Sequence, residues 1–258
     1  MPHIFNLRKD PTDRRDPVAM RSLAHLPVSV THLADLGPVR DQGNSGSCTG
    51  QAMAGFMDWL AKRFQRYLPQ TPPSQFSALF VYAEERIGDG SFPADAGSDS
   101  RSGMKVLNQM GICADSLMPF SDTAIGQRPS AVGLTQAAPF RIGAYHRVWL
   151  DAGLATSRSV LASGYCHCIG IPVYPAIESD EVAATGILPI PKQLATPSGA
   201  HEMLVYGYDD AQALEKVRNS WGAAWGIAGD LRIPYEYFAA VGGDQTSDAW
   251  VGHLGKPW

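Results

Sequence analysis

The residue best placed to do chemistry in this sequence is Cys48, which follows a polar loop rich in Gly and Ser. After it, apolar residues recur at the four-residue spacing of one helix face, at Ala52, Phe56 and Leu60. Ser47 occupies a helix N-cap position, so we expect Cys48 in the first turn, near unpaired N–H groups and the positive end of the helix dipole. This environment favours the nucleophilic thiolate. The alternative is a buried, unreactive cysteine, but a loop this polar is a poor place to bury one.

Three further polar residues occur where a catalytic cysteine needs partners. Gln42 lies shortly before Cys48 in the same loop, from which its side-chain amide can turn back toward the thiol. His201 precedes an apolar alternation that predicts a strand, and Asn219 opens the segment Asn-Ser-Trp-Gly. The bland alternatives are a loop-surface glutamine and an ordinary turn asparagine. The histidines His3, His25, His32, His146 and His253 lack such surroundings, and we expect them at the surface or at helix ends.

These three blocks, with Gln-Gly-x-x-Gly-Ser-Cys first, resemble the papain-like cysteine peptidases of the C1 type, in a bacterial form without a long propeptide. The resemblance implies that Cys48 attacks a carbonyl carbon, that His201 transfers the proton and that Asn219 orients the imidazole. Gln42 and the Cys48 N–H would form the oxyanion hole.

The resemblance also implies supporting roles. Trp221 would shield the His–Asn hydrogen bond with Trp225 beside it, although either tryptophan could simply be a large core residue. The substrate backbone would bind along Gly97, Ser98 and Ala200. Papain-like enzymes carry Gly-Gly where this chain has Gly97-Ser98, so we expect a narrower wall. Thr49 replaces the aromatic residue that normally follows the nucleophile, which removes a packing group but no catalytic atom.

The pattern of elements predicts an α+β protein. Helical periodicity occurs over residues 49–68, 76–88 and 101–111, and short β-rich runs follow at 140–150, 164–174, 202–210, 214–221 and 230–238. The resemblance implies a papain-like two-lobed fold, with a helical left lobe, a β-rich right lobe and the active-site cleft between them. We expect a single catalytic unit over 1–258, with an arm over 1–37, a helical lobe over about 38–140 and a β-rich lobe over about 141–258. The last twenty or so residues read as a terminal extension.

Composition excludes several classes of function. The net charge is −4 without a long basic run, so we expect no nucleic-acid partner, and no apolar stretch is long enough for a membrane span. The polar N-terminus does not resemble a secretory signal. Ser45 stands where secreted papain-like enzymes usually carry a disulfide cysteine. We therefore expect a reducing compartment, either the bacterial cytoplasm or a host cell into which the protein is delivered, and we expect no cofactor.

Two metal interpretations fail on spacing. Cys166-His167-Cys168 has no second Cys/His pair to complete a tetrahedral site, and on a strand its two cysteines point to one face and the histidine to the other. Core packing is therefore the better interpretation. His201-Glu202 has no second histidine at the spacing of a zinc peptidase helix. We expect no metal.

The predicted function is hydrolysis of peptide bonds in a peptide or protein substrate. The alternatives are acyl transfer, thioester hydrolysis or cyclisation, because an amine can resolve an acyl-enzyme as well as water can. A non-catalytic binding module that keeps the fold is a third possibility. The sequence leaves the oligomeric state open.

The arm before the catalytic loop suggests that no zymogen cleavage is needed. The stretch from Met1 to about Arg21 is too poor in apolar residues to build a separate inhibitory domain. We therefore expect the intact chain to react with a thiol-directed inhibitor as fast as a chain that starts at Leu26. The alternative is that the arm lies in the cleft as an extended strap.

Overall fold

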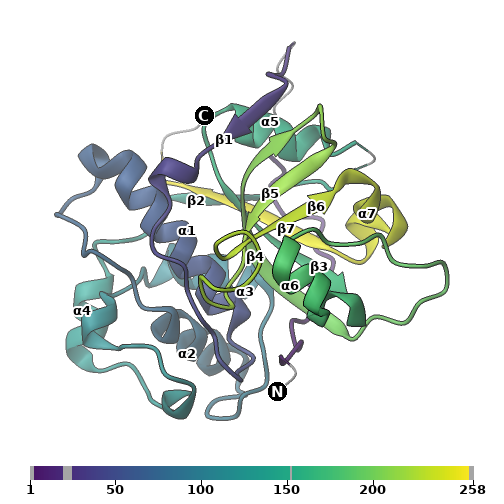
Figure 1. Cartoon of the computed structure of the whole chain (residues 1–258). Coiled ribbons are helices and arrows are strands. Elements are labelled where there is room, and N and C mark those ends of the chain that lie inside the picture. The colour runs from purple at the N-terminus through teal and green to yellow at the C-terminus, as the bar shows by residue number, and fades with distance from the viewer. Residues whose placement is uncertain (1–2, 20–24, 152, 256–258) are drawn as a thin grey trace.

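The chain divides into a helical side and a sheet side, at the left and right of Figure 1. The computed structural model describes residues 3–19, 25–151 and 153–255. The helical side holds α1 (Cys48–Phe64), α2 (Ala78–Asp89), α3 (Ser100–Gln109) and α4 (Ala131–Ala137). Short 3₁₀ turns occur at Leu33–Asp35, Gln65–Tyr67, Asp115–Leu117, Asp122–Ala124, Pro175–Glu178 and Gly243–Gln245.

One antiparallel sheet forms the other side. Its strands are β1 (Ser29–Thr31), β2 (Ala144–Arg147), β3 (His167–Val173), β4 (Gly199–Asp209), β5 (Leu214–Arg218), β6 (Asp230–Pro234) and β7 (Asp248–His253). The strand order is β2-β7-β3-β4-β5-β6, and β1 pairs with β4 as well. The helices α5 (Ala155–Ala162), α6 (Asp180–Thr185) and α7 (Tyr235–Ala240) belong to this side. The α+β class is confirmed, and the boundary between lobes near residue 140 stays a prediction.

The helix that carries Cys48 ends earlier than predicted. Helix α1 stops at Phe64, and Gln65–Tyr67 continues as a 3₁₀ turn to the break before Pro69. The next two helices follow their capping residues. The Ser77 hydroxyl accepts from the Phe80 N–H at the start of α2, and the Asp99 carboxylate accepts from the Ser102 N–H at the start of α3.

The sheet packs on both faces, because side chains alternate along each strand. On β4, Leu204 and Tyr206 join a hydrophobic core shared with α1 and α2. Met203 and Val205 join a second core, which includes residues of α5 and α7. The helical and sheet lobes therefore share one of the two cores.

The Cys-His-Cys segment of β3 follows the same alternation. Cys166 and Cys168 are fully buried in the core shared with the helices. His167 points the other way, with its Nε2 atom 2.8 Å from the Ser157 hydroxyl of α5. The surroundings of His167 agree with the core-packing interpretation.

Within the described range, the last residues of the chain are not a terminal extension. Residues Asp248–His253 form β7, which lies between β2 and β3 and pairs with both. The strand is fully buried because sheet neighbours flank it on both sides. A six-residue run after a Gly- and Asp-rich turn carries too short an alternation to predict this position.

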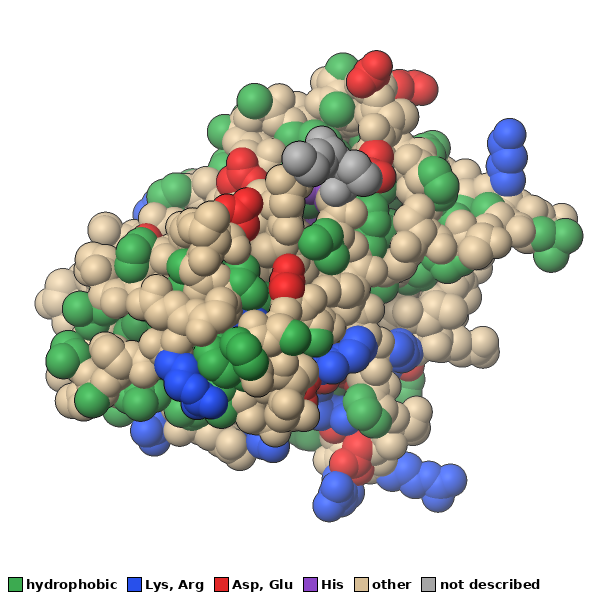
Figure 2. Space-filling model, turned by 90° about the horizontal axis from the view of Figure 1, so that it is seen from below, with side chains coloured by type: hydrophobic (Ala, Val, Ile, Leu, Met, Phe, Trp, Pro, Cys, Tyr) green, Lys and Arg blue, Asp and Glu red, His purple; other side chains and the backbone are tan. Residues whose placement is uncertain are grey.

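Within the described ranges, no helix is long and apolar enough to cross a membrane. On the face seen from below in Figure 2, hydrophobic side chains occur in small separate groups among polar and charged ones. This face therefore offers no continuous apolar surface for docking.

Candidate active site

Cys48 is the first residue of α1, as predicted. Ser47 holds the N-cap position, but its hydroxyl makes no capping bond to the helix. The Ser47 hydroxyl lies 2.8 Å from the Ser45 hydroxyl instead, because polar side chains of the loop hydrogen-bond one another. The first-turn placement of the thiol is therefore confirmed, whereas side-chain capping by Ser47 is not.

His201 and Asn219 are brought together from neighbouring strands of the sheet. The Nε2 atom of His201, on β4, lies 2.8 Å from Oδ1 of Asn219, just beyond β5. An amide oxygen can only accept, so Nε2 carries the proton and Nδ1 keeps the free lone pair. Nδ1 is buried and has no hydrogen-bond partner among the described protein atoms. This nitrogen is therefore the one available as a base.

The thiol of Cys48 lies against the beginning of β4. The backbone N–H of Glu202, next to His201, hydrogen-bonds the sulfur and acts to lower the thiol pKa. The first turn of α1 and the start of β4 thus meet at the sulfur, on the side of the sheet that packs against the helices.

Two tryptophans enclose the histidine. The Trp221 ring is stacked on the His201 ring at 5.1 Å between centroids and 28° between planes. Trp225 packs edge-on against Trp221 at 4.9 Å. Trp221 is only 6% exposed, and its ring covers the imidazole. A hydrogen bond is stronger where water is excluded, so this cover strengthens the bond between His201 and Asn219.

Gln42 is buried near Cys48, but its amide is already engaged. Its Nε2 donates to the Ser45 carbonyl at 2.9 Å, and its Oε1 accepts from the Ser220 hydroxyl at 2.7 Å. Ser220 follows Asn219, so this hydrogen bond ties the loop before α1 to the segment next to Asn219. The second N–H of the amide is the one that can serve an oxyanion. Sequence reasoning missed Ser45 and Ser220, which carry no motif of their own beyond their adjacency to the cysteine loop and to Asn219.

The protonation state differs from the expected thiolate. Burial raises the pKa of the Cys48 thiol to about 12, and the negative field of Glu202 and Glu85 adds to it. Burial also lowers the pKa of His201 to about 4, although the hydrogen bond to Asn219 opposes the shift. Both shifts favour a neutral thiol and a neutral imidazole. The helix dipole is too weak to hold a thiolate once water is excluded from the site.

Water is excluded because the N-terminal arm crosses the site. The His3 ring stacks on Trp221 at 3.9 Å, and the Phe5 ring meets the His201 ring edge-on at 6.1 Å. In Figure 1 this segment enters between the helices and α6. Cys48 and His201 are both fully buried. His3 is therefore not an ordinary surface histidine, and the expectation of an open site in the intact chain is wrong for this structure, which matches the alternative of an extended strap.

The arm lies on all three residues predicted to bind substrate. Asn6 forms a parallel β-bridge with Ala200, and the Arg8 N–H donates to the Ser98 carbonyl at 2.8 Å. A Cβ atom on Gly97 would come within 2.1 Å of the Asn6 carbonyl oxygen, so only glycine admits the arm at this distance. The structure therefore brings Gly97, Ser98 and Ala200 together as the walls of one groove that already holds a peptide segment.

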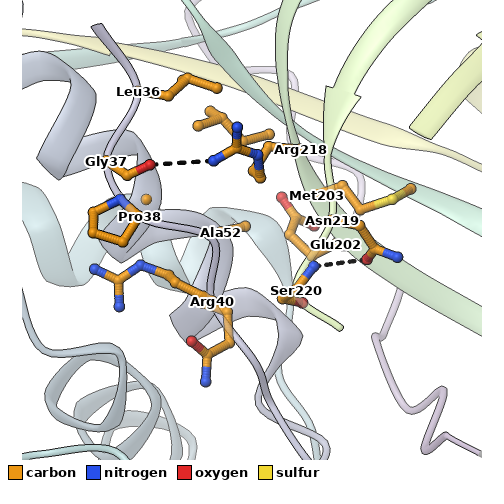
Figure 3. Close-up of a pocket in the computed structure, with 13 residues that line it drawn as sticks. Leu36, Gly37, Pro38, Arg40, Ala52, Glu202, Met203, Arg218, Asn219 and Ser220 are labelled. Atoms are coloured by element: carbon orange, nitrogen blue, oxygen red, sulfur yellow. Dashed lines mark hydrogen bonds between the residues drawn. The ribbon is translucent and has the colours of Figure 1, made fainter. Parts of the chain in front are cut away.

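A small cavity behind the site is not a substrate pocket. It measures about 20 Å³ and lies between the loop before α1, the first turns of α1, and the strands β4 and β5. Figure 3 shows Asn219 and Glu202 on one of its sides and Gly37, Pro38 and Arg40 on another. A space of this size holds about one water molecule.

Comparison with known proteins gives likenesses over nearly the whole chain. No family model matches the sequence. An uncharacterized peptidase C1-like protein of Acanthamoeba polyphaga mimivirus is 27% identical over 241 residues, which cover 90% of this chain and 72% of the viral protein.

Solved structures of similar fold are cysteine proteases. Xylellain, a cysteine protease from Xylella fastidiosa, is 29% identical, with a TM-score of 0.85 over 97% of this chain and 96% of xylellain. Digestive procathepsin L2 from the larval midgut of Tenebrio molitor has a TM-score of 0.72 at 16% identity, over 98% of this chain and 78% of that chain. The chain therefore has the papain-like fold, and the proteins that it resembles are papain-like C1 cysteine proteases.

Proposed function

We propose that this protein is a cysteine peptidase that hydrolyses peptide bonds with Cys48 as nucleophile, His201 as general base and acid, and Asn219 as the orienting group. The observation that carries the proposal is the buried His201 imidazole, held through Nε2 by Asn219 with Nδ1 free, beside a cysteine at the start of a helix. The likeness to xylellain over almost the full length of both chains supports it.

The reaction follows from these positions. Nδ1 of His201 accepts the Cys48 proton while the sulfur bonds to the substrate carbonyl carbon, whose oxygen becomes an oxyanion. The Cys48 N–H and the free N–H of the Gln42 amide stabilise that charge. Collapse of the intermediate breaks the C–N bond, and His201 returns its proton to the leaving amine. Water then attacks the thioester, and the acid product leaves with Cys48 restored as a thiol.

The substrate is an extended peptide. The groove along Gly97, Ser98 and Ala200 binds the arm through a backbone hydrogen bond and a β-bridge. Both contacts use main-chain atoms, so another extended peptide whose side chains fit the groove can make them too. No contact in the described structure favours acyl transfer or thioester hydrolysis over peptide hydrolysis. The arm must leave the groove before a substrate enters.

We further propose that the two lobes act as one catalytic unit, because they share a hydrophobic core and contribute Cys48 from one side and His201 from the other. All four cysteines are free and buried, which is the state expected in a reducing compartment.

Inhibitor labelling and turnover test the function together. A thiol-directed epoxide should label Cys48 faster than Cys113, Cys166 and Cys168, which are also buried but are not paired with His201 in the proposed mechanism. Peptide mapping by mass spectrometry measures the four rates in one sample. Cys48→Ala should abolish cleavage of a denatured protein substrate. Equal labelling of all four cysteines, or cleavage by Cys48→Ala, would refute the assignment.

A further inference from the structure

Two consecutive basic residues of the arm meet carboxylates on opposite walls of the groove. The Arg8 guanidinium pairs with Asp89, at the end of α2, and lies 3.7 Å from Asp99, at the start of α3. The Lys9 ammonium pairs with Asp248, the first residue of β7, and also donates to the Ser247 carbonyl at 2.9 Å. Arg8 is thus held by the helical lobe and Lys9 by the sheet lobe.

The backbone of this segment is bound to the groove in the way that a substrate peptide would be. The Arg8 N–H donates to the Ser98 carbonyl at 2.8 Å, on the wall predicted to bind substrate. The preceding side chain, Leu7, packs so closely on β3 that a Cβ on Gly170 would lie 2.6 Å from its Cδ2 atom. The basic pair therefore continues the same bound segment that covers His201, three and four residues after Phe5.

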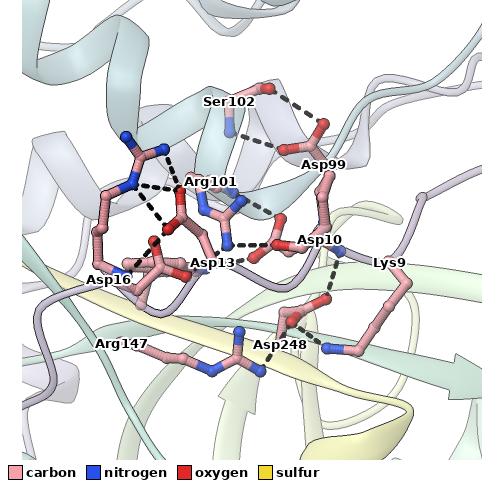
Figure 4. A network of polar contacts seen from close by, with 12 residues as sticks. Lys9, Asp10, Asp13, Asp16, Asp99, Arg101, Ser102, Arg147 and Asp248 are labelled. Atoms are coloured by element: carbon pink, nitrogen blue, oxygen red, sulfur yellow. Dashed lines mark hydrogen bonds and ion pairs between the residues drawn. The ribbon is translucent and has the colours of Figure 1, made fainter.

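Asp248 is built into the wall rather than placed on the surface. Its side chain is 4% exposed, its Oδ2 accepts from the Asp10 N–H at 2.9 Å, and Arg147 lies 3.2 Å from its Oδ1. Figure 4 shows Lys9 and Arg147 approaching this carboxylate from different sides. Two of its partners, Lys9 and the Asp10 N–H, belong to the arm and are lost when the arm leaves.

We infer that this end of the groove selects peptides with adjacent basic side chains, and that Asp248 and Asp89 are the residues that determine the selection. The inference rests on the proposed peptidase function. The arm is a peptide seated in the groove, and its Arg-Lys pair shows which side chains the walls accept.

The charge left behind after arm release supports this preference. Within the described part of the chain, Arg8 is the only cation paired with Asp89 or Asp99. Asp248 keeps Arg147, which also pairs with Asp244 at 3.3 Å. Arg101 loses its partner Asp16 when the arm leaves. Asp89 and Asp99 then keep no ion-pair partner among the described contacts, and Asp248 shares Arg147 with Asp244, so this end of the groove is negative toward a substrate.

A mixture of peptides tests the selection. The full-length Phe5→Ala protein, whose arm is less firmly held over His201, is incubated with peptides from a digested proteome, and the cleavage sites are read by mass spectrometry. We expect Lys and Arg to be enriched about tenfold at a fixed distance from the cleaved bond, which corresponds to about 1.4 kcal/mol. The same digestion is then repeated with Asp248→Asn and Asp89→Asn added separately.

Asp248→Asn and Asp89→Asn should each reduce the enrichment of Lys and Arg about tenfold, each at one position relative to the cleaved bond. Asp244→Asn is the matched control, because Asp244 pairs with Arg147 as Asp248 does but forms no ion pair with Lys9 or Arg8 among the described contacts. Asp244→Asn should leave the enrichment of Lys and Arg unchanged. If the carboxylates only anchor the arm, Asp248→Asn will raise total cleavage and leave the preference intact, and the inference is wrong.

The outcomes separate this inference from the function on which it rests. Cleavage with no preference for basic side chains overturns the inference alone. Absence of cleavage together with absence of epoxide labelling at Cys48 overturns the peptidase function, and the inference with it.

Discussion

Truncating Phe5 should uncover the catalytic histidine without touching any catalytic atom. Phe5 contributes a half-buried ring whose contacts include His201 at 6.1 Å and Trp221 at 5.9 Å. Replacing a fully buried Phe by Ala costs 3–5 kcal/mol, so a half-buried ring contributes about 2 kcal/mol to arm docking. Since 1.4 kcal/mol is a factor of ten, Phe5→Ala should raise the population with an open groove about 30-fold.

The rate of epoxide labelling at Cys48 measures this population, as long as the docked form predominates. Ile4→Ala is the matched control, because the Ile4 side chain is 37% exposed and has no ring contact with the site. It should change the rate by no more than about twofold, the effect of a typical surface substitution. Equal rates for the unmodified protein, Ile4→Ala and Phe5→Ala would show that the arm does not limit access to Cys48.

Three other predictions test the remaining parts of the site and the docking of the arm. Gln42→Ala should lower kcat/KM by roughly 2.7–4 kcal/mol of transition-state stabilisation, and an unchanged rate in the Phe5→Ala background would remove Gln42 from the oxyanion hole. Asn219→Ala should slow peptide hydrolysis less than His201→Ala, because it acts only through the imidazole that it holds; the reverse order in initial rates would contradict that role. Burial and the nearby Asp248 raise the pKa of Asp10 to about 7 from 3.8. The docked arm therefore favours protonated Asp10. Docking is strongest below pH 3.8 and weakens as the pH rises from 3.8 to about 7. The Cys48 labelling rate, divided at each pH by that of a chain that starts at Leu26, should rise between these values and become flat in Asp10→Asn.

The catalytic positions were predictable because each lies in a short segment whose chemistry is local. A cysteine after a Gly- and Ser-rich loop, followed by one apolar helix stripe, is sufficient to place Cys48 at the start of α1. The strand after His201 shows its own alternation, so the histidine lies on β4 as expected. The bond from His201 to Asn219 follows once β4 and β5 pair as neighbours.

The parts that sequence reasoning missed depend on contacts between distant segments. The arm has no periodicity, and it docks through single contacts such as the Asn6–Ala200 bridge and the stacking of His3 on Trp221. The position of β7 is set by its partners β2 and β3, both distant in the chain. The pKa of Cys48 could not be foreseen either, because it is governed by burial rather than by the helix that the sequence predicts.

The arm is fastened by residues from the opposite end of the chain, which has a consequence for the order of folding. The Trp250 Nε1–H donates to the Asp10 carboxylate at 2.6 Å, a contact that spans 240 residues. Asp10 leaves the ribosome long before Trp250, and it cannot bind until β7 has inserted between β2 and β3. The contact that fastens Asp10 can therefore form only after the chain has been made as far as β7.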